Sequence, residues 1–310
     1  MANERNTRHN VKILLVDVDS KIPNLALMKI SAFHKRKGDE VYLNTILSKP
    51  DKVYVSCIFK KNAPKVLGVA SLVDCPVEFG GYGINDRKLP DEIEHIMPDY
   101  DLYGIDYSMG FTSRGCSRRC EFCEVWRLEG PIRDHAPITE FLLPNHKKVL
   151  LLDNNFIMSP RWRENLQVII DRKLKASICQ GFDARLITRE IAITIGENQH
   201  RFYDENFSNY AIYTAWDRLQ DEEQVLRGIQ LLLDAGINAR YIRPFVLVGY
   251  NTTLEEDLYR FNKLRDMGVY PFVMPYNGRG HPLKRWGQRP ALYKRVPFIE
   301  YKTRRLEELQ

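Results

Sequence analysis

The sequence predicts an α/β protein with a small N-terminal Rossmann-like domain, a partial (β/α)6 barrel and a basic C-terminal lid. Short apolar strand patterns alternate with amphipathic helical patterns, which favours parallel sheets covered by helices. A second series of alternations starts near Asp106, and basic residues accumulate after residue 277. We therefore expect domains at residues 1–104, 105–277 and 278–310.

The N-terminal domain is predicted to begin with an apolar strand, Val11–Val16, followed by a helix over Asn24–Arg36. A further helix is expected over Ala63–Val73, because its apolar residues recur at helical spacing. The remaining strand candidates are Val41–Leu43, Lys52–Phe59 and Pro76–Gly80.

The second domain shows about six strand–helix alternations in roughly 170 residues, too few for a closed eight-stranded barrel. Four helices are expected, at Arg161–Lys173, Thr188–Asn198, Asp221–Ala235 and Thr253–Met267. The strand candidates are Tyr107–Phe111, Lys148–Asp153, Ala176–Gln180, Asn209–Thr214, Ala239–Val248 and Tyr270–Met274.

The composition is that of a soluble globular protein, with 44% hydrophobic and 28% charged residues among 310. No run approaches the roughly 18 apolar residues that a membrane span needs. The first ten residues are polar and lack the apolar core of a secretory signal. We therefore expect a cytoplasmic protein that does not enter a membrane.

Three of the six cysteines, Cys116, Cys120 and Cys123, fall within one eight-residue window directly after the first predicted barrel strand. Cysteine thiolates are the usual protein ligands of iron–sulfur clusters. The short spacings allow one loop to offer sulfur to three irons and leave the fourth open to another ligand. The scattered cysteines, which indicate no second cluster, are Cys57, Cys75 and Cys179.

Two alternatives remain open for this loop. A structural zinc site needs four ligands, the fourth being His135 or a distant cysteine. A disulfide would leave one cysteine of the three unpaired. The neighbouring Arg114, Arg118 and Arg119 favour an anionic group, because they stabilise thiolates.

The motif Cys116-x3-Cys120-x2-Cys123 resembles the signature of the radical S-adenosylmethionine (SAM) superfamily, with Phe122 at the aromatic position before the last cysteine. Residues 107–116, 80–83, 91–103 and 151–156 resemble the branch that carries a cobalamin-binding-type domain ahead of the barrel. The resemblance extends from about residue 10 to residue 276.

The resemblance implies a [4Fe–4S] cluster that cleaves SAM reductively to a 5′-deoxyadenosyl radical, which abstracts hydrogen from a substrate. It also implies an electron donor such as a flavodoxin or a ferredoxin. Cobalamin is not expected, because no histidine stands in the Asp-x-His-x-x-Gly setting of that branch; His34 fails at both ends. Cobalamin held without a histidine ligand stays open.

The candidate cofactor-binding residues lie at predicted strand ends or in the cysteine loop. The Asp153 region matches the place where family members contact the SAM amino group, and Val248 lies in the strand that backs adenine. Arg185 suits the SAM carboxylate, since its planar fork matches a carboxylate. The full set is Phe122, Asp153, Asn154, Asn155, Gln180, Asp183, Arg185, Thr214, Trp216, Asp217, Val248 and Tyr276.

Each of these residues also has a plain structural interpretation, as a loop polar group, a cap or a core side chain. Trp216 is a candidate to stack on adenine or to fill the core. Cys179 is a candidate hydrogen donor to a substrate radical or a buried structural cysteine. Arg240 and Arg243 need an acidic or ligand partner, for which Asp217 is a candidate.

The C-terminal segment carries nine Lys or Arg against three acids, which equals the net charge of +6 for the whole chain. Its basic residues alternate with aromatic ones, a pattern that suits phosphate contact with base stacking or a lid that caps the barrel. The predicted substrate is therefore a nucleic acid or another phosphate-bearing ligand, with a small metabolite or peptide as the other class. The alternative functions are a cobalamin-dependent radical SAM methyltransferase and a non-catalytic iron–sulfur protein.

Overall fold

The computed structural model describes residues 10–45, 49–278 and 280–307, without the side chains of 67, 70 and 303–307. The chain divides into two compact units, Met1–Gly110 with Pro137–His146 and Phe111–Ala136 with Lys147–Gln310. Both contain parallel strands and helices, so the expected α/β class is confirmed. Among the described residues, no helix is long and apolar enough to cross a membrane.

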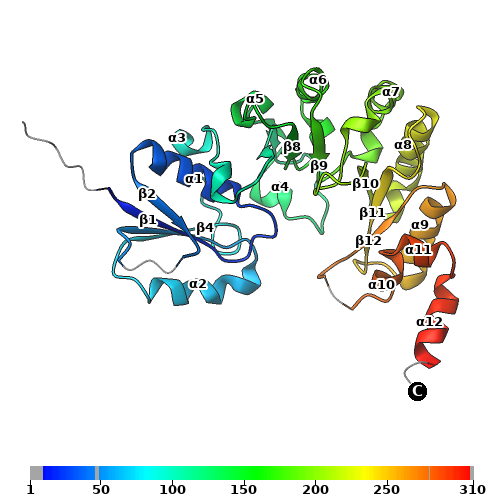
Figure 1. Ribbon diagram of the computed structural model, residues 1–310. Helices are drawn as coiled ribbons and strands as arrows, with labels where there is room; N and C mark the ends of the chain where they lie inside the picture. The colour runs from blue at the N-terminus through cyan, green and yellow to red at the C-terminus, as the bar shows by residue number, and fades with distance from the viewer. Residues whose placement is uncertain (1–9, 46–48, 279, 308–310) are drawn as a thin grey trace, which may run out of the picture. The chain divides into compact units, whose positions relative to one another are not determined.

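The first unit is built on a four-stranded sheet in the order β2-β1-β3-β4, and every neighbouring pair of strands is parallel (Figure 1). Two longer helices accompany it, α1 (Leu25–Arg36) and α2 (Ala63–Ala70). Shorter elements are α3 (Asp91–Glu94), α5 (Ile138–Phe141) and β5 (Ser108–Gly110). The sheet strands are β1 (Lys12–Asp17), β2 (Glu40–Leu43), β3 (Lys52–Ser56) and β4 (Val77–Gly80).

Both faces of this sheet are covered, because alternate residues of β1 enter different cores. Ile13 packs with Ile30 of α1, whereas Leu14 packs with Val66 of α2. Successive side chains of a strand point to opposite faces, so each helix buries one set. This arrangement explains why the β1 sequence is apolar without alternation.

Polar side chains order the start and the end of α1. Asn24 caps the helix by accepting the Leu27 amide, and its Nδ2 donates to Ser56 Oγ at the end of β3. His34 is buried, with Nδ1 2.7 Å from Asp39 Oδ2 and Nε2 3.1 Å from Tyr54 Oη. His34 is therefore a packed residue of the first unit.

The second unit contains two sets of parallel strands, β8 with β9 and β10 with β11 and β12. The strands are β8 (Lys148–Leu151), β9 (Lys175–Ile178), β10 (Ile212–Trp216), β11 (Ile242–Val248) and β12 (Phe272–Pro275). Helices α6 (Trp162–Asp171), α7 (Arg189–Glu197), α8 (Glu222–Asp234) and α9 (Leu254–Asp266) follow β8, β9, β10 and β11 along the chain (Figure 1).

The local sequence explains where these helices begin. Thr253 and Glu256 form a capping box at the start of α9, in which each side chain binds the other residue's backbone amide. Thr188 caps α7 by accepting the Ile191 amide. Gly228 of α8 permits close packing, because a Cβ there would lie 1.9 Å from the Ala184 carbonyl oxygen.

The C-terminal segment forms three helices, each of which buries an aromatic side chain: Trp286, Tyr293 and Phe298. The helices are α10 (Leu283–Gly287), α11 (Pro290–Tyr293) and α12 (Phe298–Glu307). Trp286 is fully buried, its ring centroid lies 4.9 Å from that of Phe261 in α9, and its indole N–H donates to the Val296 carbonyl. The segment is thus anchored on α9.

Candidate functional site

The cysteine loop lies between two short antiparallel strands, β6 (Ser113–Arg114) and β7 (Arg133–Asp134). One helical turn, α4 (Val125–Leu128), follows the third cysteine. The Cys123 amide donates to the Cys120 carbonyl at 3.0 Å, and the Trp126 indole donates to the same carbonyl. The loop is therefore closed at its base and folded on itself.

Gly115 allows the loop to leave β6. It adopts φ +81°, and a Cβ at this position would lie 2.3 Å from the Pro131 carbonyl oxygen. Its amide donates to Asn154 Oδ1 at 3.1 Å. Only glycine suits both the left-handed backbone and this close approach.

Asp153 ties the start of the loop to the end of β8. Its buried carboxylate accepts the backbone amide and the hydroxyl of both Thr112 and Ser113, at 2.6–3.0 Å. Burial raises the pKa of this carboxyl, and the four hydrogen bonds oppose that rise. Asp153, predicted to contact SAM, holds the start of the loop in place.

Two thiols of the loop lie in partly buried surroundings. The Arg118 amide and the Asn155 side chain near Cys116, and the Val125 amide near Cys123, act to lower the pKa of these thiols. Burial raises the pKa of both thiols above the usual value. Metal binding replaces the thiol protons, so a group of three thiols in one loop suits a metal cluster.

The described residues contain no group of three or more His, Cys, Asp or Glu side chains placed to hold one metal ion. This finding gives no support to the zinc alternative, in which the ligands converge on a single ion. A four-iron cluster makes a different demand, because each thiolate binds its own iron. The His135 ring contacts Phe111 at 6.5 Å between centroids.

A buried network of charges lies beside the loop. Asp183 accepts from Arg185 Nε at 2.7 Å, from Arg118 Nε at 3.2 Å and from Asn155 Nδ2 at 3.2 Å. Burial alone would raise the pKa of Asp183, but the hydrogen bonds and charge of Arg185 lower it below its usual value. Asp183 is therefore an ionised carboxylate that orders both arginines.

The guanidinium of Arg185 also donates to Asp221 Oδ2 at 2.9 Å, and Arg218 binds both oxygens of Asp221. Two carboxylates thus occupy the fork that was expected to bind the SAM carboxylate. Arg185 orders this network, and its contact with the SAM carboxylate stays a prediction.

Two polar groups near the loop have no protein partner among the described residues. Asn155 Oδ1 is buried without a hydrogen bond. Asp217, which follows β10, has no hydrogen bond or ion pair, and burial raises its pKa to about 6. Unpartnered buried polar groups are costly, so both are candidates to bind a ligand.

Aromatic side chains from three segments form a row that begins in the cysteine loop. The Phe122 ring lies edge-on to Tyr250 at 5.6 Å, and Tyr250 lies edge-on to Tyr276 at 4.7 Å between centroids. Val248 is buried, and its carbonyl accepts the Tyr276 amide. Phe122 and Tyr276, both predicted from the sequence, are thus joined through Tyr250, which was not in the predicted set.

The other predicted residues differ in their surroundings. Trp216 is fully buried and donates to the Arg218 carbonyl, so no ring face is left for adenine. Thr214 is buried and its hydroxyl has no partner among the described residues. Gln180 is exposed. The Cys179 thiol donates to the Leu151 carbonyl, and burial raises its pKa to about 12, which keeps it neutral.

Arg243 does not pair with Asp217, the partner considered from the sequence. Its guanidinium lies 3.9 Å from Asp204 instead, and Arg240 is exposed.

A second ion pair, which the sequence analysis did not predict, is formed by Arg260 and Asp257, both completely buried in α9. His281 Nε2 lies 3.0 Å from the other oxygen of Asp257. An arginine on the apolar face of a helix is the sequence signal for such a pair.

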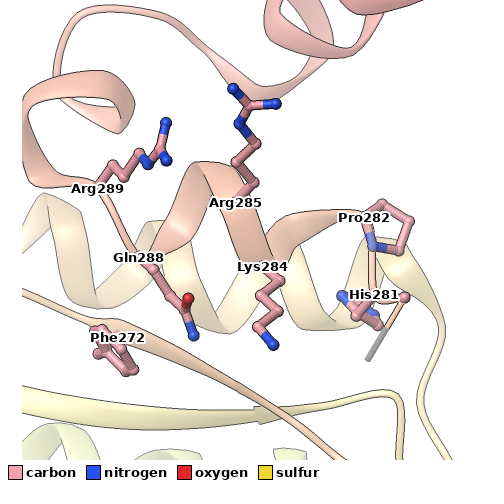
Figure 2. Close-up of a pocket in the computed structure, with 8 residues that line it drawn as sticks. Phe272, His281, Pro282, Lys284, Arg285, Gln288 and Arg289 are labelled. Atoms are coloured by element: carbon pink, nitrogen blue, oxygen red, sulfur yellow. The ribbon is translucent and has the colours of Figure 1, made fainter. Parts of the chain in front are cut away.

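The basic C-terminal segment lines a cavity of about 570 Å³, which contains no acidic side chain among its described lining residues (Figure 2). Lys284 and Gln288 lie on one side of α10, and Arg285 and Arg289 point away from them (Figure 2). Arg285 and Arg289 are exposed and have no ion-pair partner among the described residues. Arg279, also part of the predicted basic segment, lies outside the described residues.

Comparison with protein-family models and with curated proteins gave no match for this chain.

Proposed function

We propose that this chain is a radical SAM enzyme whose [4Fe–4S] cluster is held by Cys116, Cys120 and Cys123. The observation that carries the proposal is the construction of the loop. Asp153 and Asn154 fix its start, and the Cys123 amide donates to the Cys120 carbonyl, so the three cysteines stand in one ordered loop.

The fold supports a finer description in each unit. The order β2-β1-β3-β4, with helices on both faces, supports a Rossmann-like first domain. The succession of parallel strands and helices from β8 to β12 supports a partial (β/α)6 barrel in the second part of the chain. The cysteine loop and the polar residues Asp153, Asp183 and Asp217 follow strand ends, where such folds place their sites.

When bound, the cluster supplies the electron for reductive cleavage of SAM, and the resulting 5′-deoxyadenosyl radical abstracts hydrogen from the substrate. The protein's residues would bind and orient these groups. Asn155 Oδ1 and Asp217 offer acceptors for the amino or hydroxyl groups of SAM. Arg118 and Arg185 place positive charge near the loop, and the Phe122–Tyr250–Tyr276 row offers aromatic surface beside it.

A nucleic acid or another phosphate-bearing ligand is the substrate class that we propose. The cavity beside Lys284, Arg285 and Arg289 supports it, because its described lining has cationic side chains and no acidic one. Arginines without carboxylate partners are free to bind phosphate.

The proposal is tested by anaerobic reconstitution of the protein with iron and sulfide, followed by reduction in the presence of SAM. We expect four irons per chain and 5′-deoxyadenosine from the wild type, and neither from Cys120→Ala. Cys75→Ala is the matched control, since Cys75 lies in the first unit, and it should retain both. Uptake of zinc in place of a four-iron cluster, or equal product from Cys120→Ala, would refute the proposal.

A further inference from the structure

A second cavity, of about 470 Å³, opens at the edge of the strands opposite to the cysteine loop. Lys175 begins β9, Arg240 and Tyr241 precede β11, and Tyr270 precedes β12. Because the strands are parallel, these residues share the N-terminal edge, whereas the cysteine loop and Asp153 belong to the C-terminal edge. The cavity is therefore separate from the proposed radical site.

A rigid hairpin, residues 203–210, forms one wall of this cavity. Tyr203 and Tyr210 form an antiparallel bridge, and Asp204 accepts the amides of Ser208 and Asn209 and the side chain of Asn209. Phe207 at its tip adopts φ +56°, an uncommon backbone for an aromatic residue. The hairpin is thus held in shape by its own hydrogen bonds.

Aromatic rings form a continuous array along this wall. The centroids of Tyr203 and Tyr210 are 4.8 Å apart, those of Tyr210 and Tyr241 are 4.9 Å apart, and the His200 ring lies 4.9 Å from Tyr210. Because the rings contact one another, their side-chain conformations are already restricted in the protein without a ligand. Restricted aromatic side chains favour stacking with a flat ligand, because less side-chain freedom is lost on binding.

Cations around the array outnumber the two carboxylates of the hairpin, Asp204 and Glu205. Arg240 is exposed and has no ion-pair partner among the described residues, and Lys175 lies over the Tyr203 ring at 4.9 Å without a carboxylate. Arg243 is 3.9 Å from Asp204, whose oxygens already serve the hairpin. Glu205 accepts from the Tyr213 hydroxyl at 3.0 Å. An anionic ligand in this cavity would therefore lie close to Arg240 and Lys175, two cations without a carboxylate partner among the described residues.

We propose that this cavity, the tyrosine pocket lined by Lys175, Tyr203, Tyr210, Arg240, Tyr241 and Tyr270, binds a nucleobase that carries a phosphate. The base stacks on the tyrosine array, and the phosphate meets Arg240 and Lys175. The volume falls within the range of small-molecule sites. Stacking rings interleaved with cations are also the means by which proteins hold single-stranded nucleic acid. The ligand is thus a free nucleotide or one residue of such a strand.

Isothermal titration of the full chain with adenosine 5′-monophosphate, adenosine and a hexa-adenylate RNA tests this proposal. The wild type should bind the monophosphate about tenfold more tightly than adenosine, because a charge-assisted contact to phosphate is lost with the nucleoside. Arg240→Gln should abolish this preference. Tyr241→Leu should weaken binding of all three probes by about fivefold or more, whereas Tyr241→Phe keeps the ring and should stay within about twofold.

Two controls separate the pocket from other effects. Lys60→Gln removes an exposed cation of the first unit and should leave monophosphate binding unchanged, and thermal unfolding should show that Arg240→Gln folds as the wild type does. Monophosphate binding equal to that of the RNA identifies a free nucleotide as the ligand. RNA binding at least about tenfold tighter, and weakened by salt, identifies a strand. Failure of both to bind, or binding unaffected by Arg240→Gln and Tyr241→Leu, overturns the proposal.

Discussion

The carboxylate of Asp153 accepts both the backbone amide and the hydroxyl of Ser113, each at 2.6 Å. This contact joins the end of β8 to the strand from which the cysteine loop departs, so the geometry of the loop depends on a charge buried in the second unit. Loss of this contact should lower the free energy of unfolding and, as a consequence, the amount of cluster that the protein assembles.

Asp153→Ala should lower the free energy of unfolding by about 2–4 kcal/mol, because four donors then remain buried without an acceptor. Urea unfolding measures the change, and iron content after reconstitution should fall with it. The exposed Asp266, which pairs only with Arg265, is the matched control. Asp266→Ala should shift stability by no more than about 0.5 kcal/mol. Equal effects at the two positions would contradict the anchoring role.

Arg260→Leu should destabilise the protein by about 3–5 kcal/mol, since it leaves Asp257 buried without its cation. The guanidinium also donates to the carbonyls of Trp216 and Leu247, and these would lose their donors. Arg265→Leu changes the same residue type at a partly exposed position of α9, where the guanidinium pairs with the exposed Asp266, and should have little effect. Urea unfolding of the two variants gives the comparison, and a small change in Arg260→Leu would show that the pair contributes no net stability.

Much of the fold follows from local sequence patterns. The strand expected over Ala239–Val248 is observed as β11, Ile242–Val248, and the helix expected over Asn24–Arg36 is α1, Leu25–Arg36. These elements have strong apolar periodicity and recognisable caps. Short elements without such a signal, including β6 and β7, were not predicted, because two-residue strands depend on their partner strand rather than on their own sequence.

The site was harder to predict than the fold. Spacing identified the cysteines and the positions at strand ends, but it could not assign partners to Asp183, Arg185 or Asp221. Asp183 and Asp221 are distant in the sequence, yet both bind the guanidinium of Arg185. Only the three-dimensional structure shows which carboxylates lie next to it. Trp216 shows the same limit, because an aromatic residue at a strand end suits a core and a stacking surface equally well.

Asp217 should make stability depend on pH in a specific direction. Its pKa is about 6 in the folded protein, above the usual 3.8, because burial disfavours the charge. Between these values the folded state binds more protons, so stability falls as pH rises. In protein without iron and sulfide, Asp217→Asn should be more stable than the wild type by about 1–3 kcal/mol at pH 8 and indistinguishable at pH 4.

Unfolding curves at several pH values measure this dependence. Asp221→Asn is the matched comparison, because Asp221 receives hydrogen bonds from Arg185 and Arg218. That variant should be less stable than the wild type at pH 8. A loss of stability at pH 8 in Asp217→Asn as well would mean that the ionised carboxylate has a stabilising partner.

Tyr250→Ala should slow 5′-deoxyadenosine formation by about tenfold, because it removes the ring that joins Phe122 to Tyr276 beside the cysteine loop. Tyr250→Phe preserves the ring and should stay within about twofold. Stability should change little in either variant, since Tyr250 is only partly buried. The rate is measured with reconstituted protein of equal iron content, and equal rates for Tyr250→Ala and the wild type would exclude the row from the site.

The basic cavity of the C-terminal segment predicts that RNA binding weakens as the salt concentration rises. If single-stranded RNA binds there, neutralising Lys284 and Arg285 together should reduce the slope of log K against log salt by about 1.4, from the release of two counterions. Both side chains line the cavity, and Arg285 has no carboxylate partner among the described residues. The double variant Lys37→Gln, Lys60→Gln removes two exposed cations of the first unit and should leave the slope unchanged. An equal slope in the two double variants would place the phosphate contacts elsewhere on the protein.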